Sequence, residues 1–198
     1  MSVSGSSADE HQACVDVGSS AVDGSAVPGC VFCKLAAAAA SGHDREVVYC
    51  DELVYVVADI APAAQTHLLV IPRNHVRDCD SEELSEAMLR HMRDVGVKML
   101  QRAGHPLEQS RLGFHVPPCI SQPHLHLHVL GGTFRAPCSH RCACCEADQC
   151  CAPCDCMRLK YTPWCCWYRD VDAQLRRMAR WKDVDHGQPP IGQSMQEG

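Results

Sequence analysis

The stretch SQPHLHLHVLGG, residues 121–132, places a histidine at every second position from 124 to 128, with a leucine between neighbours. Successive side chains of a β-strand point to opposite faces, so strict alternation predicts a half-buried strand. One face then carries His124, His126 and His128, spaced about 7 Å apart. Gly131 and Gly132 follow, and glycine tolerates the backbone angles that a change of direction needs. Three imidazoles on one face indicate nucleophilic, proton-transferring or metal-binding chemistry.

Length and charge exclude several other classes of protein. The chain has 198 residues, enough for one domain with tails, and a formal net charge of −6. That charge argues against general binding to polymeric nucleic acid. No apolar run is long enough to cross a bilayer and no signal peptide opens the chain, so we expect a cytoplasmic or nuclear protein without a membrane partner. In a reducing compartment its 16 cysteines are expected as metal ligands or thiols.

Composition divides the chain into five parts. Residues 1–28 are rich in Ser, Gly, Ala and Asp and predict a disordered tail. Regular apolar patterns from 29 to 136 predict one folded domain. A cysteine-rich insertion at 137–157, an aromatic segment with a helix at 158–182 and a second disordered tail at 183–198 complete the chain.

The folded part is predicted to contain several strands and two helices. Strands are predicted at 53–59, 67–72 and 111–116, in addition to the histidine strand. A short helix is predicted within 30–42, and a long amphipathic helix over 80–104 with Asp80 as its N-cap. The connections are too short for parallel crossovers. We therefore expect an α+β fold, an antiparallel sheet with both helices packed on it.

Motifs in the same order and spacing resemble the histidine triad superfamily of nucleotide hydrolases and transferases. They are CVFCKL (30–35), ADIAPAAQTHLLVIPRNHV (58–76) and LGFHVPPCISQPHLHLHVL (112–130), which ends in the alternating histidines. The sequence is most similar to the nucleotide-binding branch and its third, aprataxin-like subgroup. The resemblance covers about residues 30–134, with a weaker echo at 161–180. It implies that 29–136 is a nucleotide-binding domain with the HIT-like fold.

The resemblance also implies a covalent mechanism. His126 would attack the α-phosphorus of a nucleotide, which splits one difficult displacement into two steps. His128 and His67 would hydrogen-bond the phosphate, and Ser121 would assist the leaving group. For Ser121 an ordinary surface hydroxyl is an equal alternative. A histidine rather than a glutamine at position 128 marks the hydrolase branches of the superfamily.

A nucleoside pocket follows from the same resemblance. Asp59 matches the acid that accepts the ribose hydroxyls. Five apolar residues match the slot that holds the base, namely Val31, Phe32, Leu35, Ile60 and Leu69. Apolar walls with few polar anchors are typical of such pockets.

Members of the superfamily that carry a Cys-x-x-Cys pair use it for a structural zinc, with a histidine before the triad and the first triad histidine. The matching residues are Cys30, Cys33, His75 and His124. Two sulfurs and two imidazoles form a closed tetrahedral set, although free thiols are an alternative. For the cysteines between 138 and 156, a second zinc site and a thiol-rich loop remain open.

The expected function is that of a nucleoside phosphoramidate hydrolase that releases a nucleoside monophosphate from a purine nucleotide. Close relatives are often homodimers, so we expect a homodimer. One alternative is hydrolysis of adenylated nucleic-acid ends, suggested by the arginines and aromatic residues of 158–182. Another is a nucleotide-binding scaffold with weak catalysis. His115 stands where many relatives have an asparagine, and it lies outside the expected catalytic set.

Overall fold

The computed structural model describes residues 26–40, 47–117, 120–134, 161 and 167–185. The predicted cysteine-rich insertion lies outside the described residues, as do 1–25 and 186–198 of the two predicted tails. Residues 183–185, assigned to the second tail, belong to a helix, so that assignment is wrong at its start. No helix of the described residues is both long and apolar enough to cross a membrane.

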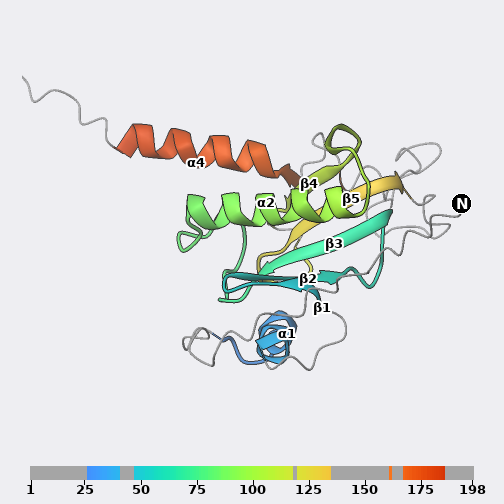
Figure 1. Ribbon diagram of the computed structural model, residues 1–198. Coiled ribbons are helices and arrows are strands. Elements are labelled where there is room, and N and C mark those ends of the chain that lie inside the picture. The colour runs from blue at the N-terminus through green and yellow to red at the C-terminus, as the bar shows by residue number, and fades with distance from the viewer. Residues whose placement is uncertain (1–25, 41–46, 118–119, 135–160, 162–166, 186–198) are drawn as a thin grey trace, which may run out of the picture.

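One six-stranded antiparallel sheet forms the centre of the structure (Figure 1). The strands are β1 (Val47–Cys50), β2 (Val54–Ala58), β3 (Ala64–Pro72), β4 (Arg111–His115), β5 (Leu127–Phe134) and β6 (Tyr168–Asp170), and they pair in the order β1-β2-β3-β5-β4-β6. The strand that ends the histidine motif is therefore central, between β3 and β4. The predicted α+β fold with an antiparallel sheet is confirmed.

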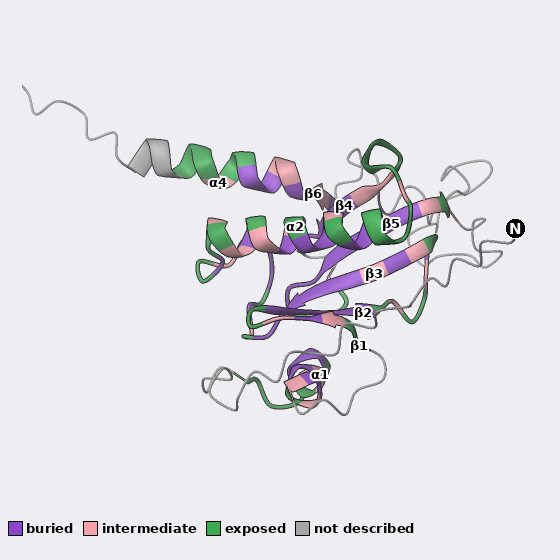
Figure 2. Cartoon of the chain, viewed as in Figure 1, coloured by how far each residue is buried: buried purple, intermediate pink, exposed green. Residues whose placement is uncertain are grey.

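Helices cover both faces of the sheet. Helix α1 (Val31–Ala40) packs against Tyr55, Val57, Leu69 and Ile71 on one face. Helix α2 (Glu86–Arg102) packs on the other face, where the buried residues include Val54, Val56, Val70, Leu127 and Val129. Alternate residues of β2 and β3 thus serve opposite cores, as the two-residue period of a strand requires. Figure 2 shows the central strands mostly buried between these layers, with partly exposed and exposed residues toward one end of β3 and β5.

Helix α2 begins later than the sequence suggested. Ser85 is the N-cap, and its hydroxyl accepts a hydrogen bond from the Met88 N–H at 3.1 Å. The predicted N-cap Asp80 lies before a turn in which Leu84 N–H donates to the Ser81 carbonyl at 3.1 Å. This turn delays the first helical residue, so the assignment of Asp80 as N-cap is wrong.

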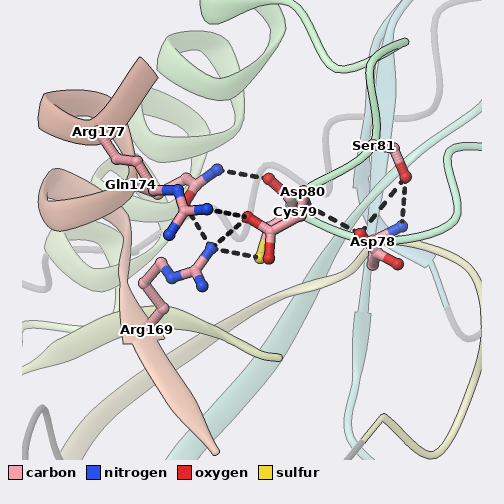
Figure 3. Close-up of polar contacts among 7 residues, drawn as sticks. All are labelled: Asp78, Cys79, Asp80, Ser81, Arg169, Gln174 and Arg177. Carbon is pink, nitrogen blue, oxygen red and sulfur yellow. Dashed lines mark hydrogen bonds and ion pairs between the residues drawn. The ribbon is translucent and has the colours of Figure 1, made fainter. Parts of the chain in front are cut away.

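Asp80 instead anchors the C-terminal helix α4 (Val171–Asp185). Arg169 donates to the Asp80 carboxylate at 2.5 Å and to the Gln174 side-chain oxygen at 2.8 Å, as Figure 3 shows. The Gln174 amide in turn donates to the Cys79 carbonyl. These bonds join β6 and α4 to the loop before α2. The predicted helix from about Asp170 is confirmed, with Val171 as its first residue.

Candidate active site and metal centre

His126 lies one residue before β5 and is 7% exposed. Pairing with β3 begins at the next residue, Leu127, opposite Val70. Before it, the Leu125 N–H donates to the Val76 carbonyl at 2.6 Å. The His126 Nδ1 atom is 2.7 Å from the His124 carbonyl oxygen. A carbonyl only accepts, so Nδ1 carries the proton and the lone pair of the neutral ring lies on Nε2. Nε2 is therefore the atom whose lone pair is available for the predicted nucleophilic attack.

Three further histidines, His67, His128 and His115, form a connected row that we call the histidine array. The Ala63 N–H donates to His67 Nδ1 at 3.1 Å, so the proton of neutral His67 lies on Nε2. His67 Nε2 donates to His128 Nδ1 at 2.9 Å, and His128 Nε2 donates to His115 Nδ1 at 3.1 Å. One backbone N–H thus sets the tautomers of all three rings.

Asp59 lies beside this array, in the bend after β2. Its Oδ2 atom is 3.3 Å from His67 Nε2 and 3.9 Å from His128 Nδ1, while Oδ1 accepts the Ala61 N–H at 2.8 Å. The side chain is 14% exposed. The predicted ribose-binding acid therefore borders the array, and its role toward a ribose stays a prediction.

The predicted base-slot residues are only partly brought together. Phe32 and Leu69 are buried in one cluster and Leu35 packs against it. The Phe32 ring centroid lies 5.3 Å from that of His126, so this cluster borders the nucleophile. Val31 is 44% exposed and Ile60 is 99% exposed, and neither belongs to the cluster. Their assignment to the slot stays a prediction.

Ser121 is exposed, in the bend that precedes the histidines. Within the described part of the chain it makes no hydrogen bond, and its role stays a prediction. Nearby, a narrow crevice in front of His126 is lined by Arg77, Asp78, His115 and Gln122, among others. Arg77 and Gln122 add polar groups to the crevice, and no sequence pattern had selected them.

The four predicted metal ligands converge at the N-terminus of α1. One ligand atom from each of Cys30, Cys33, His75 and His124 lies within 4.8 Å of the others, so this cluster could hold a metal ion. His124 Nε2 donates to the Pro72 carbonyl at 3.0 Å, which leaves the lone pair on Nδ1, facing both sulfurs. Burial lowers the pKa of His124 to about 4, so the ring is neutral at neutral pH, the form that binds metals.

Two residues of the site were missed at the sequence level. His115 completes the array. Its place where many relatives have an asparagine was the sequence signal for it, and its contact with His128 depends on the register that pairs Gly113 with His128. Tyr161 places its ring centroid 5.0–5.3 Å from those of His67, His115 and His128. It comes from the far side of the cysteine-rich segment, and no local pattern marked it.

The chain has paired cysteines at the start of α1, a buried histidine on β3 and alternating histidines that lead into β5. In this order, and around one antiparallel sheet, they define a histidine triad protein. The family model described as "Scavenger mRNA decapping enzyme C-term binding" matches residues 29–143. The chain belongs to this family, and the resemblance to the histidine triad superfamily is confirmed.

Curated relatives lie in the same superfamily. Adenosine 5'-monophosphoramidase HINT3 of Xenopus tropicalis is 41% identical over 103 residues, which are 51% of this chain and 66% of that protein. Bifunctional adenosine 5'-phosphosulfate phosphorylase/adenylylsulfatase HINT4 of Arabidopsis thaliana is 39% identical over 102 residues, 50% of this chain and 67% of that protein. Aprataxin of Gallus gallus is 39% identical over 94 residues, 46% of this chain and 28% of aprataxin. The chain thus spans about two thirds of the length of the first two relatives.

Proposed function

We propose that this protein hydrolyses nucleoside phosphoramidates, with a purine nucleoside monophosphate as one product and an amine as the other. The observation that carries the proposal is the 2.7 Å bond between His126 Nδ1 and the His124 carbonyl, which presents Nε2 as a nucleophile. The two relatives named as an adenosine monophosphoramidase and an adenylylsulfatase support an adenylate substrate.

The reaction takes two steps. His126 Nε2 forms a bond to the α-phosphorus as the phosphorus–nitrogen bond breaks, and the amine leaves after taking a proton, for which Ser121 is the proposed donor. The His126 ring then carries positive charge, which the His124 carbonyl oxygen stabilises through Nδ1–H. Water next attacks phosphorus and returns a proton to the Ser121 oxygen, the bond to Nε2 breaks, and neutral His126 and the Ser121 hydroxyl are restored with release of the nucleoside monophosphate.

The other residues bind and orient the nucleotide. His128 and His67 are the proposed donors to phosphoryl oxygens. The single N–H of each neutral ring donates to the next ring of the array, so a bound phosphate would have to share or replace that acceptor. Asp59 is the proposed acceptor of the ribose hydroxyls. Phe32, Leu35 and Leu69 form the inner wall of the base slot, with Val31 and Ile60 at its open side.

The cysteine and histidine cluster is proposed to bind one structural zinc. Zinc–sulfur and zinc–nitrogen bonds of about 2.3 and 2.0 Å at a tetrahedral angle separate sulfur from nitrogen by about 3.5 Å. Cys30 and Cys33 Sγ lie 3.4 and 3.6 Å from His124 Nδ1, and Cys33 Sγ lies 3.4 Å from His75 Nδ1. The donor set fits zinc. Bound zinc would hold His124, whose carbonyl orients His126.

Intact-protein mass spectrometry after brief incubation with an adenosine phosphoramidate tests the activity. We expect an adenylate adduct on the parent protein, none on His126→Ala, and an unchanged adduct on His91→Ala, a matched histidine on α2. Absence of both adduct and released AMP from the parent protein would refute the proposal.

A second candidate is hydrolysis of adenylated nucleic-acid ends. It is favoured by one surface, the exposed Arg176, Arg180 and Trp181 on α4, and by the aprataxin relative. A nick-containing adenylated duplex offered beside the phosphoramidate distinguishes the two. If this candidate is correct, Arg176→Ala with Arg180→Ala slows turnover of the duplex alone.

Two further expectations are also proposals. A homodimer is checked by sedimentation equilibrium, in which a monomer mass at micromolar concentration would refute it. Residence in the cytoplasm or nucleus is checked by imaging the full chain with a small C-terminal epitope.

A further inference from the structure

Tyr161 packs its ring against all three members of the histidine array. The residue is 3% exposed. Its ring meets His67 at a centroid distance of 5.3 Å and His128 at 5.1 Å, both edge to face, and His115 at 5.0 Å with a tilt of 39°. One side chain therefore contacts every member of the array.

The ring of Tyr161 is held by residues of the sheet. Arg111 on β4 donates to the Tyr161 carbonyl at 3.0 Å, and the same guanidinium lies 4.4 Å from the centroid of Phe134 on β5. Tyr161 also shares a buried cluster with Leu130 and Tyr168. Since the contacts come from β4, β5 and β6, the ring is fixed relative to the strands that carry the histidines.

An imidazole ring alone does not keep its orientation. Rotation by about 180° around χ2 exchanges a nitrogen for a carbon at nearly unchanged shape, and the terminal torsion of histidine is broad. In the array such a flip of His128 would replace both of its nitrogen contacts, to His67 and to His115. A bulky neighbour in contact with all three rings leaves little space for this rotation.

We propose that Tyr161 is a positioning residue, whose ring holds His67, His128 and His115 in the orientation that keeps their hydrogen bonds. The kinetic part of this inference rests on the proposed phosphoramidate hydrolysis. The structural part, the orientation of the imidazoles, does not.

Two substitutions separate the ring from its hydroxyl group. Tyr161→Phe keeps the ring and Tyr161→Leu removes it. Phe134→Leu is the matched control, because it takes an aromatic ring from the edge of the same cluster and Phe134 has no ring contact with the described histidines. In each protein, ¹⁵N NMR of the histidine side chains reports which ring nitrogen carries the proton, without any substrate.

We expect Tyr161→Leu to change the ring-nitrogen signals of His67 and His128 and to lower kcat by about tenfold to a hundredfold, as small misplacements of reacting groups do. KM should change little. The loss of a buried ring lowers the thermal midpoint, so kcat is measured well below the unfolding range of the variant. Tyr161→Phe and Phe134→Leu should keep the parent signals and stay within about twofold of the parent kcat.

Other outcomes overturn the proposal. One is parent-like histidine signals in Tyr161→Leu. Another is an equal loss of kcat in Tyr161→Phe, which would assign the effect to the hydroxyl. If the parent protein does not turn over the phosphoramidate, the proposed function fails while the NMR comparison still decides the role of Tyr161.

Discussion

The backbone N–H of Ala63 donates to Nδ1 of His67 at 3.1 Å, and this bond determines where the protons of the histidine array lie. His67 must then donate from Nε2 to His128, which must donate from Nε2 to His115. A second proton on His67 or His128 would lie on Nδ1, the atom that accepts a hydrogen bond in each ring. Two hydrogens would then face each other, at the Ala63 N–H for His67 and at His67 Nε2–H for His128. The array is therefore built for neutral rings.

His67 tests the array directly. His67→Phe keeps the ring shape but removes both nitrogen contacts, and it should lower kcat by about a hundredfold, the usual effect of losing one donor to a developing charge. His67→Gln retains an N–H near the position of Nε2 and should recover part of that loss. Steady-state kinetics with an adenosine phosphoramidate measures both. Equal activity of the two variants would contradict a donor role for His67.

The metal cluster predicts a measurable zinc content. Cys33→Ala should bind one zinc fewer per chain than the parent protein by inductively coupled plasma mass spectrometry, because Cys33 lies within 3.6 Å of both histidine ligands. It should also lose at least about 2 kcal/mol of unfolding free energy, a fall in Tm of about 4–8 °C for a chain of this size.

Cys79→Ala is the control for that measurement. Cys79 is buried but lies outside the cluster, and burial raises the pKa of its thiol to about 12, so it is protonated at neutral pH. Its removal should leave the zinc content unchanged. Equal zinc in Cys33→Ala and the parent would refute the assigned ligand set.

The sequence predicted the parts of the structure that local pattern encodes. Alternation and β-branched runs located β2, β3 and β4, and helical spacing located α2, because a buried face imposes its period on the residues that cover it. The short strands β1 and β6 were not predicted. Each has four residues or fewer and lies at an edge of the sheet, where pairing with a neighbour rather than a local pattern decides the strand.

The residues of the site likewise divide into those that the sequence selected and those whose proximity depends on the tertiary fold. The resemblance selected Cys30, Cys33, His75 and His124, and the structure places these four together. His115 and Tyr161 were not selected, because their proximity to His128 depends on the β4–β5 register and on a segment that returns after residue 160. Contacts of that kind arise from the tertiary fold and leave no trace in local spacing.

The hydrogen bonds of the Asp51 carboxylate should make the free energy of unfolding depend on pH. Although burial opposes its ionisation, hydrogen bonds from the Val54 and Leu53 N–H groups, Tyr49 and His91 hold the pKa of the Asp51 carboxyl below its usual value of 3.8. The four donors lie at 2.8–3.0 Å and join the β1–β2 turn to α2. Asp51→Ala should therefore cost about 1–3 kcal/mol at neutral pH.

The sign of the pH dependence follows from the lowered pKa. The carboxylate stabilises the folded state fully above about pH 5, and this contribution disappears as pH falls through the folded-state pKa. Urea unfolding of parent and Asp51→Ala from pH 7 to pH 3 should show a difference that narrows only below about pH 4. A difference that stays constant down to pH 3 would show that the bonds do not depend on the charge.

The absence of a side chain at Gly113 on β4 allows β6 to lie close against this strand. A Cβ atom at Gly113 would overlap the Tyr168 ring and lie 2.5 Å from the Arg169 carbonyl oxygen, so alanine forces β6 outward. Tyr168 contacts both Tyr161 and His115, at ring centroid distances of 6.0 and 6.4 Å. Gly113→Ala should therefore cost about 2 kcal/mol of unfolding free energy and lower kcat as well.

A double-mutant cycle with Tyr168→Leu isolates that contact. Leucine is shorter than tyrosine and leaves room for the new Cβ, so Gly113→Ala should cost at least about 1 kcal/mol less in the Tyr168→Leu background than in the parent. Urea unfolding of the four proteins gives the coupling free energy. A coupling free energy near zero would mean that the Arg169 backbone, and not the Tyr168 ring, limits how closely β6 approaches β4. Gly113→Ala would then lower stability without displacing Tyr168, and the contacts of the tyrosines with the histidine array would stay unchanged.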